Sequence, residues 1–167
     1  VAAGKTCLKI PLLYGIDAVH GNAGVLGATV FPHFIGLGAS HDPDLVKRVA
    51  VAVADEMAAT GIYWSFSPNV DVAQDIRWGK TYETFGSDTE NVARLGLSYL
   101  KGTQDSSSGY FNVVATLKHY IGGGAMEYGT SRNKNFKIEE GNITVDEKTF
   151  RPVHLVPFTR AVAGGAQ

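Results

Sequence analysis

The first recognisable feature in the pattern of hydrophobic and polar positions is a short apolar run. Residues 10–16 form this run between Lys9 and Asp17, and its length and its β-branched and aromatic content are typical of a buried strand. Residues 21–41 come next as a long stretch punctuated by glycines, which predicts a loop. The chain therefore begins with a predicted strand and a long loop after it.

A helix is predicted next. Asp42 and Pro43 mark its start, because Asp is a good N-cap and Pro is accepted at the first helical position. Gly61 predicts its end. The apolar residues between them recur at three- and four-residue steps, as on one face of a helix: Leu45, Val46, Val49, Val53 and Met57.

The same order of elements then returns. Residues 62–72 carry apolar and aromatic side chains and predict a second strand. Residues 87–90 read Ser-Asp-Thr-Glu, the S-x-x-E form of a capping box that opens a helix. Gly102 predicts the end of this helix. Its predicted inward face consists of Val92, Leu95, Tyr99 and Leu100.

A third strand is predicted over residues 113–117, and after it a loop that contains Gly-Gly-Gly at 122–124. Residues 144–147 form another possible capping box. Pro152 and Pro157 should divide the C-terminal segment into two short helices, because proline lacks the backbone N–H that a helix interior requires.

Three consecutive β/α units with long loops after the strands predict an α/β protein with a parallel sheet. Both doubly wound sheets and (β/α)8 barrels bind ligands at the carboxyl ends of their strands. Three units cannot close a barrel, and a three-stranded parallel sheet leaves two open edges. We therefore expect this sequence to be part of a larger domain.

Composition excludes several classes of protein. The 167 residues contain 15 Lys and Arg against 16 Asp and Glu, a formal charge of −1, which argues against a nucleic-acid binder. With 44% hydrophobic residues the chain is too apolar for a disordered segment. Cys7 is the single cysteine, so an intrachain disulfide is excluded. We find neither an apolar stretch long enough for a membrane span nor the layout of a signal peptide.

Polar residues stand where each predicted strand passes into its loop: Asp17, Arg77 with Trp78, and Lys118 with His119. Together they offer donors and acceptors suited to a polyhydroxylated or anionic ligand. Each residue also has a structural alternative. Asp17 is equally well explained as a loop cap, and Trp78 as a core residue rather than a stacking platform for a sugar.

Other candidate sites remain open or are weak. Arg77 has a salt bridge with Asp75 or Glu83 as its structural alternative. No spacing selects an acid and base pair among the available carboxylates, which are Asp17, Asp71, Asp75 and Glu83. The glycines at 122–124 lack the spacing of a dinucleotide site. The loop histidines lack the spacing of a helical zinc pair: His20, His33 and His41.

Considered together, the motifs resemble the N-terminal barrel domain of the family 3 glycoside hydrolases, and the resemblance covers nearly the whole chain. The motifs occur in that family's order and at its spacing. They are IPLLYGIDAVHG at 10–21, ATVFP at 28–32, GLGA at 36–39, SPNVDV at 67–72, RWGK at 77–80, YETFGSD at 82–88 and KHY at 118–120.

The resemblance implies a β-glucosidase-like enzyme that hydrolyses terminal β-D-glucosyl residues with retention of configuration. It implies a partial (β/α)8 TIM-type barrel for residues 1–167, with the remaining strands and a second α/β sandwich domain outside them. It also implies that Asp17, Arg77, Lys118 and His119 line the subsite of the non-reducing sugar. Arg132 is a further candidate contact in this subsite.

The departures from the family pattern matter as well. Nothing between His119 and Gln167 matches the Ser-Asp-Trp or Ser-Asp-Tyr motif of the family's nucleophile, and the family's acid/base residue lies in its second domain or beyond. We therefore assign no catalytic residue to this chain. The stretch at 120–124 favours the glucosidase branch over the branch that releases N-acetylglucosamine.

The expected partner is a β-glucoside or oligosaccharide, with no cofactor, no metal, no nucleic acid and no membrane span. The compartment is open, although the resemblance favours a secreted or periplasmic protein. Three alternatives also stay open. They are a non-catalytic carbohydrate-binding fragment, a β-N-acetylglucosaminidase or β-xylosidase of the same family, and an unrelated α/β phosphate binder.

Overall fold

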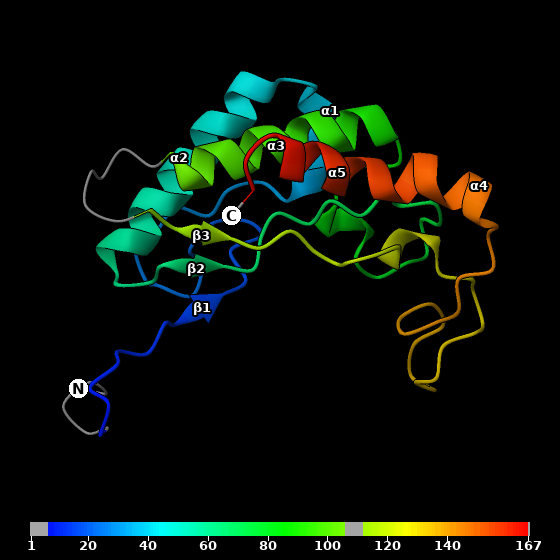
Figure 1. Cartoon of the computed structure of the whole chain (residues 1–167), viewed down its shortest axis with the longest axis horizontal. Coiled ribbons are helices and arrows are strands. Elements are labelled where there is room, and N and C mark those ends of the chain that lie inside the picture. Colours follow the sequence, from blue (N-terminus) through cyan, green and yellow to red (C-terminus); the bar gives the residue numbers. More distant parts are fainter. Residues whose placement is uncertain (1–6, 106–111, 167) are drawn as a thin grey trace.

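The computed structural model describes residues 7–105 and 112–166. Its centre is a parallel sheet of three short strands, β1 (Gly15–Ile16), β2 (Trp64–Ser65) and β3 (Val114–Ala115), in the order β1-β2-β3. Helices α2, α3 and α5 all lie along one face of this sheet (Figure 1). The predicted α/β class with a parallel sheet is confirmed.

The helices follow the strands in chain order. Their bounds are α1 (Phe34–Ser40), α2 (Pro43–Ala59), α3 (Thr89–Gln104), α4 (Glu147–Phe150) and α5 (Val156–Ala163). Short 3-10 turns occupy Thr81–Glu83 and Gly123–Ala125, and a π-helical turn occupies Arg151–Leu155. None of the helices in the described part of the chain is long and apolar enough to cross a membrane.

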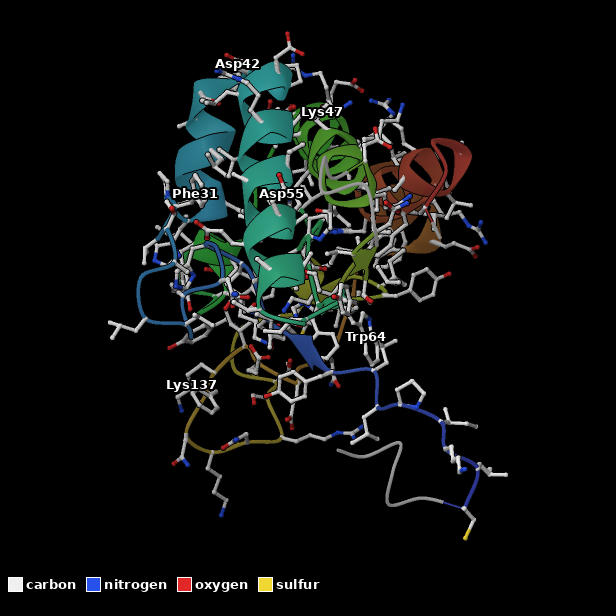
Figure 2. The ribbon with its side chains drawn as sticks, turned by 90° about the vertical axis from the view of Figure 1, so that its left-hand side faces the viewer. Phe31, Asp42, Lys47, Asp55, Trp64 and Lys137 are labelled. Carbon is white, nitrogen blue, oxygen red and sulfur yellow. The ribbon has the colours of Figure 1, made fainter. Side chains whose placement is uncertain are left out.

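The predicted start and end of α2 are confirmed. The Asp42 carboxylate accepts hydrogen bonds from the backbone N–H groups of Asp44 and Leu45, both at 3.0 Å, which satisfies donors that lack a partner at a helix N-terminus. Gly61 follows the last turn with φ +79°, a backbone conformation that glycine adopts without strain. Figure 2 shows Asp42 at one end of α2 and Trp64 beyond the other, beside the sheet.

The start and end of α3 differ from the prediction. Asp88, not Ser87, is the N-cap, and its carboxylate accepts a hydrogen bond from the Asn91 N–H at 2.7 Å. The helix also continues through Gly102. A Cβ at this glycine would lie 2.5 Å from the Lys47 carbonyl oxygen, so Gly102 allows α2 and α3 to approach closely rather than ending α3.

The C-terminal helices also differ in detail. Asp146, not Thr144, caps α4 and accepts from the Thr149 N–H at 2.9 Å. Pro152 and Pro157 do separate two short helices, but a π-helical turn joins α4 and α5 directly. Each proline lies at the start of its helical segment, where the missing backbone N–H is tolerated.

Two expectations near the N-terminus are wrong. Most of the predicted strand over 10–16 is exposed, with Leu12 at 81%, and only Gly15–Ile16 pairs with a neighbour. Within the described sheet, β1 is an edge strand and has a partner on one side alone. The predicted loop over 21–41 contains α1, which has no side-chain cap and carries two glycines, so its local signal is weak.

The main core lies between the sheet and the helices. The predicted inward faces of α2 and α3 supply much of it, and α1 and the loop before α3 add aromatic rings. Phe34 stacks on Phe85, and Tyr99 meets Phe34 edge to face at 4.8 Å between ring centroids. This packing fixes the strands from one side and leaves their loops to form the candidate site.

Candidate functional site

Asp17 and Lys118 meet at the carboxyl end of the sheet. Asp17 directly follows β1, Lys118 comes three residues after β3, and their side chains form an ion pair across 101 residues of sequence. The Lys118 side chain is only 16% exposed, whereas Asp17 is open to solvent. A parallel sheet brings these two residues together because the carboxyl ends of its strands share one edge.

Asp71 and His119 form a second contact beside the first. One carboxylate oxygen of Asp71 accepts from the backbone N–H of His119 at 3.1 Å and lies 2.8 Å from its Nδ1. The Asp71 side chain is 1% exposed, while the His119 side chain is 36% exposed. The buried carboxylate therefore holds a partly accessible imidazole. In the sequence, Asp71 stood out only as one of four available carboxylates.

Lys80 and Glu139 complete this cluster and were not predicted. Lys80 Nζ lies 3.5 Å from His119 Nε2 and 2.9 Å from the Glu139 carboxylate, which also accepts from the Trp78 indole N–H. Burial works against the charge of Lys80, but the bond to Glu139 and the nearby acidic groups outweigh it and raise the Lys80 pKa. Lys80 belongs to the RWGK motif, whereas Glu139 has no local sequence signal.

The Arg77 side chain contacts Asp75 and Tyr128. Its guanidinium pairs with Asp75 at 2.6 Å and lies over the Tyr128 ring at 3.9 Å. The hydrogen bonds from Arg77 lower the Asp75 pKa to about 2, and the same pairing raises the pKa of Arg77. The salt bridge that the sequence left open is therefore formed, and Asp75 rather than Glu83 is the partner.

Two cavities adjoin these residues. The larger has a volume of about 750 Å³ and the smaller about 250 Å³, and Glu139 lines both. The larger is lined by Arg77, Gly79, Lys80, Tyr82, Glu83, Tyr128, Asn135, Phe136, Lys137, Ile138 and Glu139. Lys137 lies in the loop that extends away from the helices (Figure 2). His119 lines the smaller cavity.

Two further expectations concern Trp78 and Arg132. Trp78 is 3% exposed and packs against Ala73 and Ile138, so it is a core residue and does not offer an open face for stacking on a sugar. Arg132 is exposed and lines neither of the two cavities. The structure therefore does not bring Arg132 together with the other candidates.

The three glycines at 122–124 serve close packing. Gly122 has φ +96°, and a Cβ at Gly123 would lie 3.0 Å from the Asp71 carboxylate. A Cβ at Gly124 would lie 2.1 Å from the Val72 carbonyl oxygen. These glycines let the loop after β3 lie directly against the segment after β2.

The loop histidines have packing roles. His20 and His33 meet edge to face at 4.8 Å, and His41 Nδ1 is 3.0 Å from the Asn91 side-chain oxygen. Across residues 7–105 and 112–166, no group of three or more His, Cys, Asp or Glu is arranged to hold a metal ion.

Comparisons with known proteins show which family the chain belongs to. The family described as "Glycosyl hydrolase family 3 N terminal domain" matches residues 1–167. A β-xylosidase from Formosa agariphila is 34% identical over 93% of this chain, and a periplasmic β-glucosidase from Salmonella typhimurium is 38% identical over 75% of it. The crystal structure of a β-glucosidase from Listeria innocua in complex with glucose matches 98% of the chain with a TM-score of 0.80 and 30% identity.

The chain spans about one fifth of the length of these relatives: 21% of the β-xylosidase, 16% of the Salmonella enzyme and 22% of the Listeria chain. The match of the family covers every residue of the chain, and the parallel α/β fold is shared with the solved β-glucosidase. The chain therefore belongs to glycosyl hydrolase family 3, and its match lies in the N-terminal domain of that family.

Proposed function

We propose that this chain binds the terminal glucosyl residue of a β-glucoside and belongs to an enzyme that hydrolyses the bond with retention of configuration. Asp17, Lys118 and His119 contact the sugar in this proposal, and Arg77 borders it. The observation that carries the proposal is the meeting of Asp17 and Lys118 at the carboxyl end of the sheet. Supporting it, the related Listeria β-glucosidase has been crystallised with glucose.

The chemistry of these groups suits a sugar. A carboxylate accepts and an ammonium donates charge-assisted hydrogen bonds, and each of these bonds has about twice the strength of a neutral one. The Asp17–Lys118 pair presents both to a ligand with several hydroxyls. Such bonds also stabilise the oxocarbenium-like transition state of glycoside hydrolysis when they strengthen as it forms.

The nucleophile and the general acid are proposed to lie outside residues 1–167. Asp71 is an unsuitable nucleophile because its carboxylate is buried and engaged by His119. Correspondingly, we propose that the three strands are part of an incomplete (β/α)8 barrel, with a second domain elsewhere in the protein. A periplasmic or secreted location is proposed from the periplasmic relative.

Sugar binding gives the direct test. In calorimetric titration the protein should bind glucose, and Asp17→Ala or Lys118→Ala should each weaken binding by about 10- to 100-fold, the effect of losing one charged hydrogen bond. Lys47→Ala is the matched control, because Lys47 forms a similar ion pair with Asp105 away from the site. Unchanged affinity in both site variants would contradict the proposal. Tighter binding of xylose than glucose would favour a β-xylosidase, as in the Formosa relative.

Hydrolysis separates binding from chemistry. Residues 1–167 expressed alone should release no measurable aglycone from an aryl β-glucoside, because the two carboxyl groups that glycoside hydrolysis requires are proposed to lie elsewhere. The measurement is a chromogenic assay alongside the glucose titration. Clear turnover that disappears in Asp17→Ala would show that a catalytic carboxylate lies within the chain.

A further inference from the structure

The two ring nitrogens of His119 have partners of opposite chemistry. Nδ1 lies 2.8 Å from the Asp71 carboxylate, and Nε2 lies 3.5 Å from the Lys80 ammonium. A neutral imidazole carries its proton on one nitrogen and a lone pair on the other. The two partners therefore determine which nitrogen carries the proton.

Asp71 requires the proton to be on Nδ1. An ionised carboxylate accepts hydrogen bonds and cannot donate them. The same oxygen that faces Nδ1 also accepts a hydrogen bond from the backbone N–H of His119, so the carboxylate contacts both the main chain and the ring of this residue. Its burial at 1% exposure and the packing of Gly123 against it leave the carboxylate little room to turn away.

Lys80 requires a lone pair on Nε2. An ammonium group has three donors and no acceptor. Lys80 keeps its charge because it pairs with Glu139, and its pKa is raised despite its partial burial. A proton on Nε2 would point at this cation, so the Nε2–H tautomer is disfavoured.

The other groups near this cluster do not change the preference of His119 for a proton on Nδ1. His154 is buried near enough to Asp71 for the two groups to interact electrostatically. Burial nevertheless lowers the His154 pKa, so His154 does not compete as a cation with His119 for the Asp71 carboxylate. Lys118, the neighbour of His119, is directed to Asp17. Asp71 and Lys80 are thus the groups that meet the ring of His119.

We propose that Asp71 and Lys80 are positioning residues that hold His119 in the Nδ1–H tautomer, so that Nε2 is a hydrogen-bond acceptor for a sugar hydroxyl. The role in sugar binding rests on the function proposed above. A ligand hydroxyl that donates to Nε2 would replace a long contact with Lys80 by a shorter one. His119 therefore recognises a donor hydroxyl, whereas Lys118 supplies a donor of its own.

The tautomer is measured directly by long-range proton–nitrogen NMR of the histidine-labelled protein near neutral pH, with His119 assigned by loss of its signals in His119→Asn. We expect a protonated Nδ1 and an unprotonated Nε2 without any sugar present. A proton on Nε2, or on both nitrogens, would overturn the proposal. Because no ligand is needed, this measurement stands even where glucose fails to bind, and that failure would count against the proposed function alone.

Variants test the two positioning residues. In Asp71→Asn and in Lys80→Met the preference for Nδ1–H should weaken and glucose affinity should fall about tenfold, the effect of one hydrogen bond. Lys80→Arg keeps a cationic donor and should retain the tautomer. Asp105→Asn is the matched control, because it makes the same chemical change in a surface pair. A tautomer unchanged in both Asp71→Asn and Lys80→Met would contradict the positioning roles. If Asp71→Asn does not fold, the tautomer in Lys80→Met by itself tests the proposal.

Discussion

Replacing Gly124 with alanine should destabilise the protein by about 3 kcal/mol, within the range known for inserting atoms into a packed interior. The new Cβ would lie 2.1 Å from the Val72 carbonyl oxygen, and one of these two backbone segments must move. The Gly124 carbonyl also accepts from the Gln74 N–H at 3.1 Å. The same movement would separate Asp71 from His119, so glucose affinity should fall together with stability.

Thermal unfolding and glucose titration of Gly124→Ala measure both effects. Gly24→Ala is the matched control, because a Cβ at Gly24 would have no atoms within 4 Å and this position does not require a positive φ. A midpoint of unfolding equal to that of the unmodified protein would show that the loop after β3 tolerates the displacement. The close approach would then not be needed to hold the site.

Tyr99→Ala should have the largest effect on stability, about 3–5 kcal/mol, as found for removing a large aromatic side chain from a core. The ring is fully buried and packs against Phe34 and Phe85. Its hydroxyl donates to the Ala18 carbonyl at 3.2 Å, which ties α3 to the residue directly after Asp17. Burial also raises the pKa of Tyr99, so the hydroxyl keeps its proton as a donor.

Denaturant unfolding of Tyr99→Ala and Tyr99→Phe separates packing from hydrogen bonding. Tyr99→Phe keeps the ring and should cost about 1 kcal/mol, the contribution of one hydrogen bond. Equal losses in the two variants would mean that the bond to Ala18, rather than the ring, is the main contribution of this residue. A loss below about 1 kcal/mol in Tyr99→Ala would contradict its place in the core.

The positions and core faces of α2 and α3 were largely predicted from the sequence. Asp42, Pro43 and Gly61 act within a few residues of themselves, so their effect on α2 is local and readable. The apolar spacing of α2 and α3 also identified side chains that are buried in the structure. In α3 the predicted cap was wrong, because Ser87 and Asp88 are both good N-caps and only the observed geometry selects Asp88.

Strand lengths were poorly predicted, for a physical reason. An apolar run identifies residues that suit a strand, but pairing requires a neighbour at the right distance. Within the described sheet β1 has one neighbour, and Leu12 and Tyr14 are exposed beside it. The apolar run at 10–16 therefore favours a strand, but among the described residues of this run only Gly15 and Ile16 pair with a neighbouring strand.

The candidate site likewise depends partly on local sequence and partly on the tertiary structure. The order of residues was sufficient to predict α2 and α3, the parallel α/β class and the polar residues that follow the strands, because these depend on spacing within short segments. Which of those residues meet was settled by the folded chain. It joined Asp17 to Lys118 and Asp71 to His119, paired Arg77 with Asp75, and brought Glu139 to Lys80. Most of these contacts join residues far apart in sequence, and packing of the whole fold, rather than any local pattern, sets their distances.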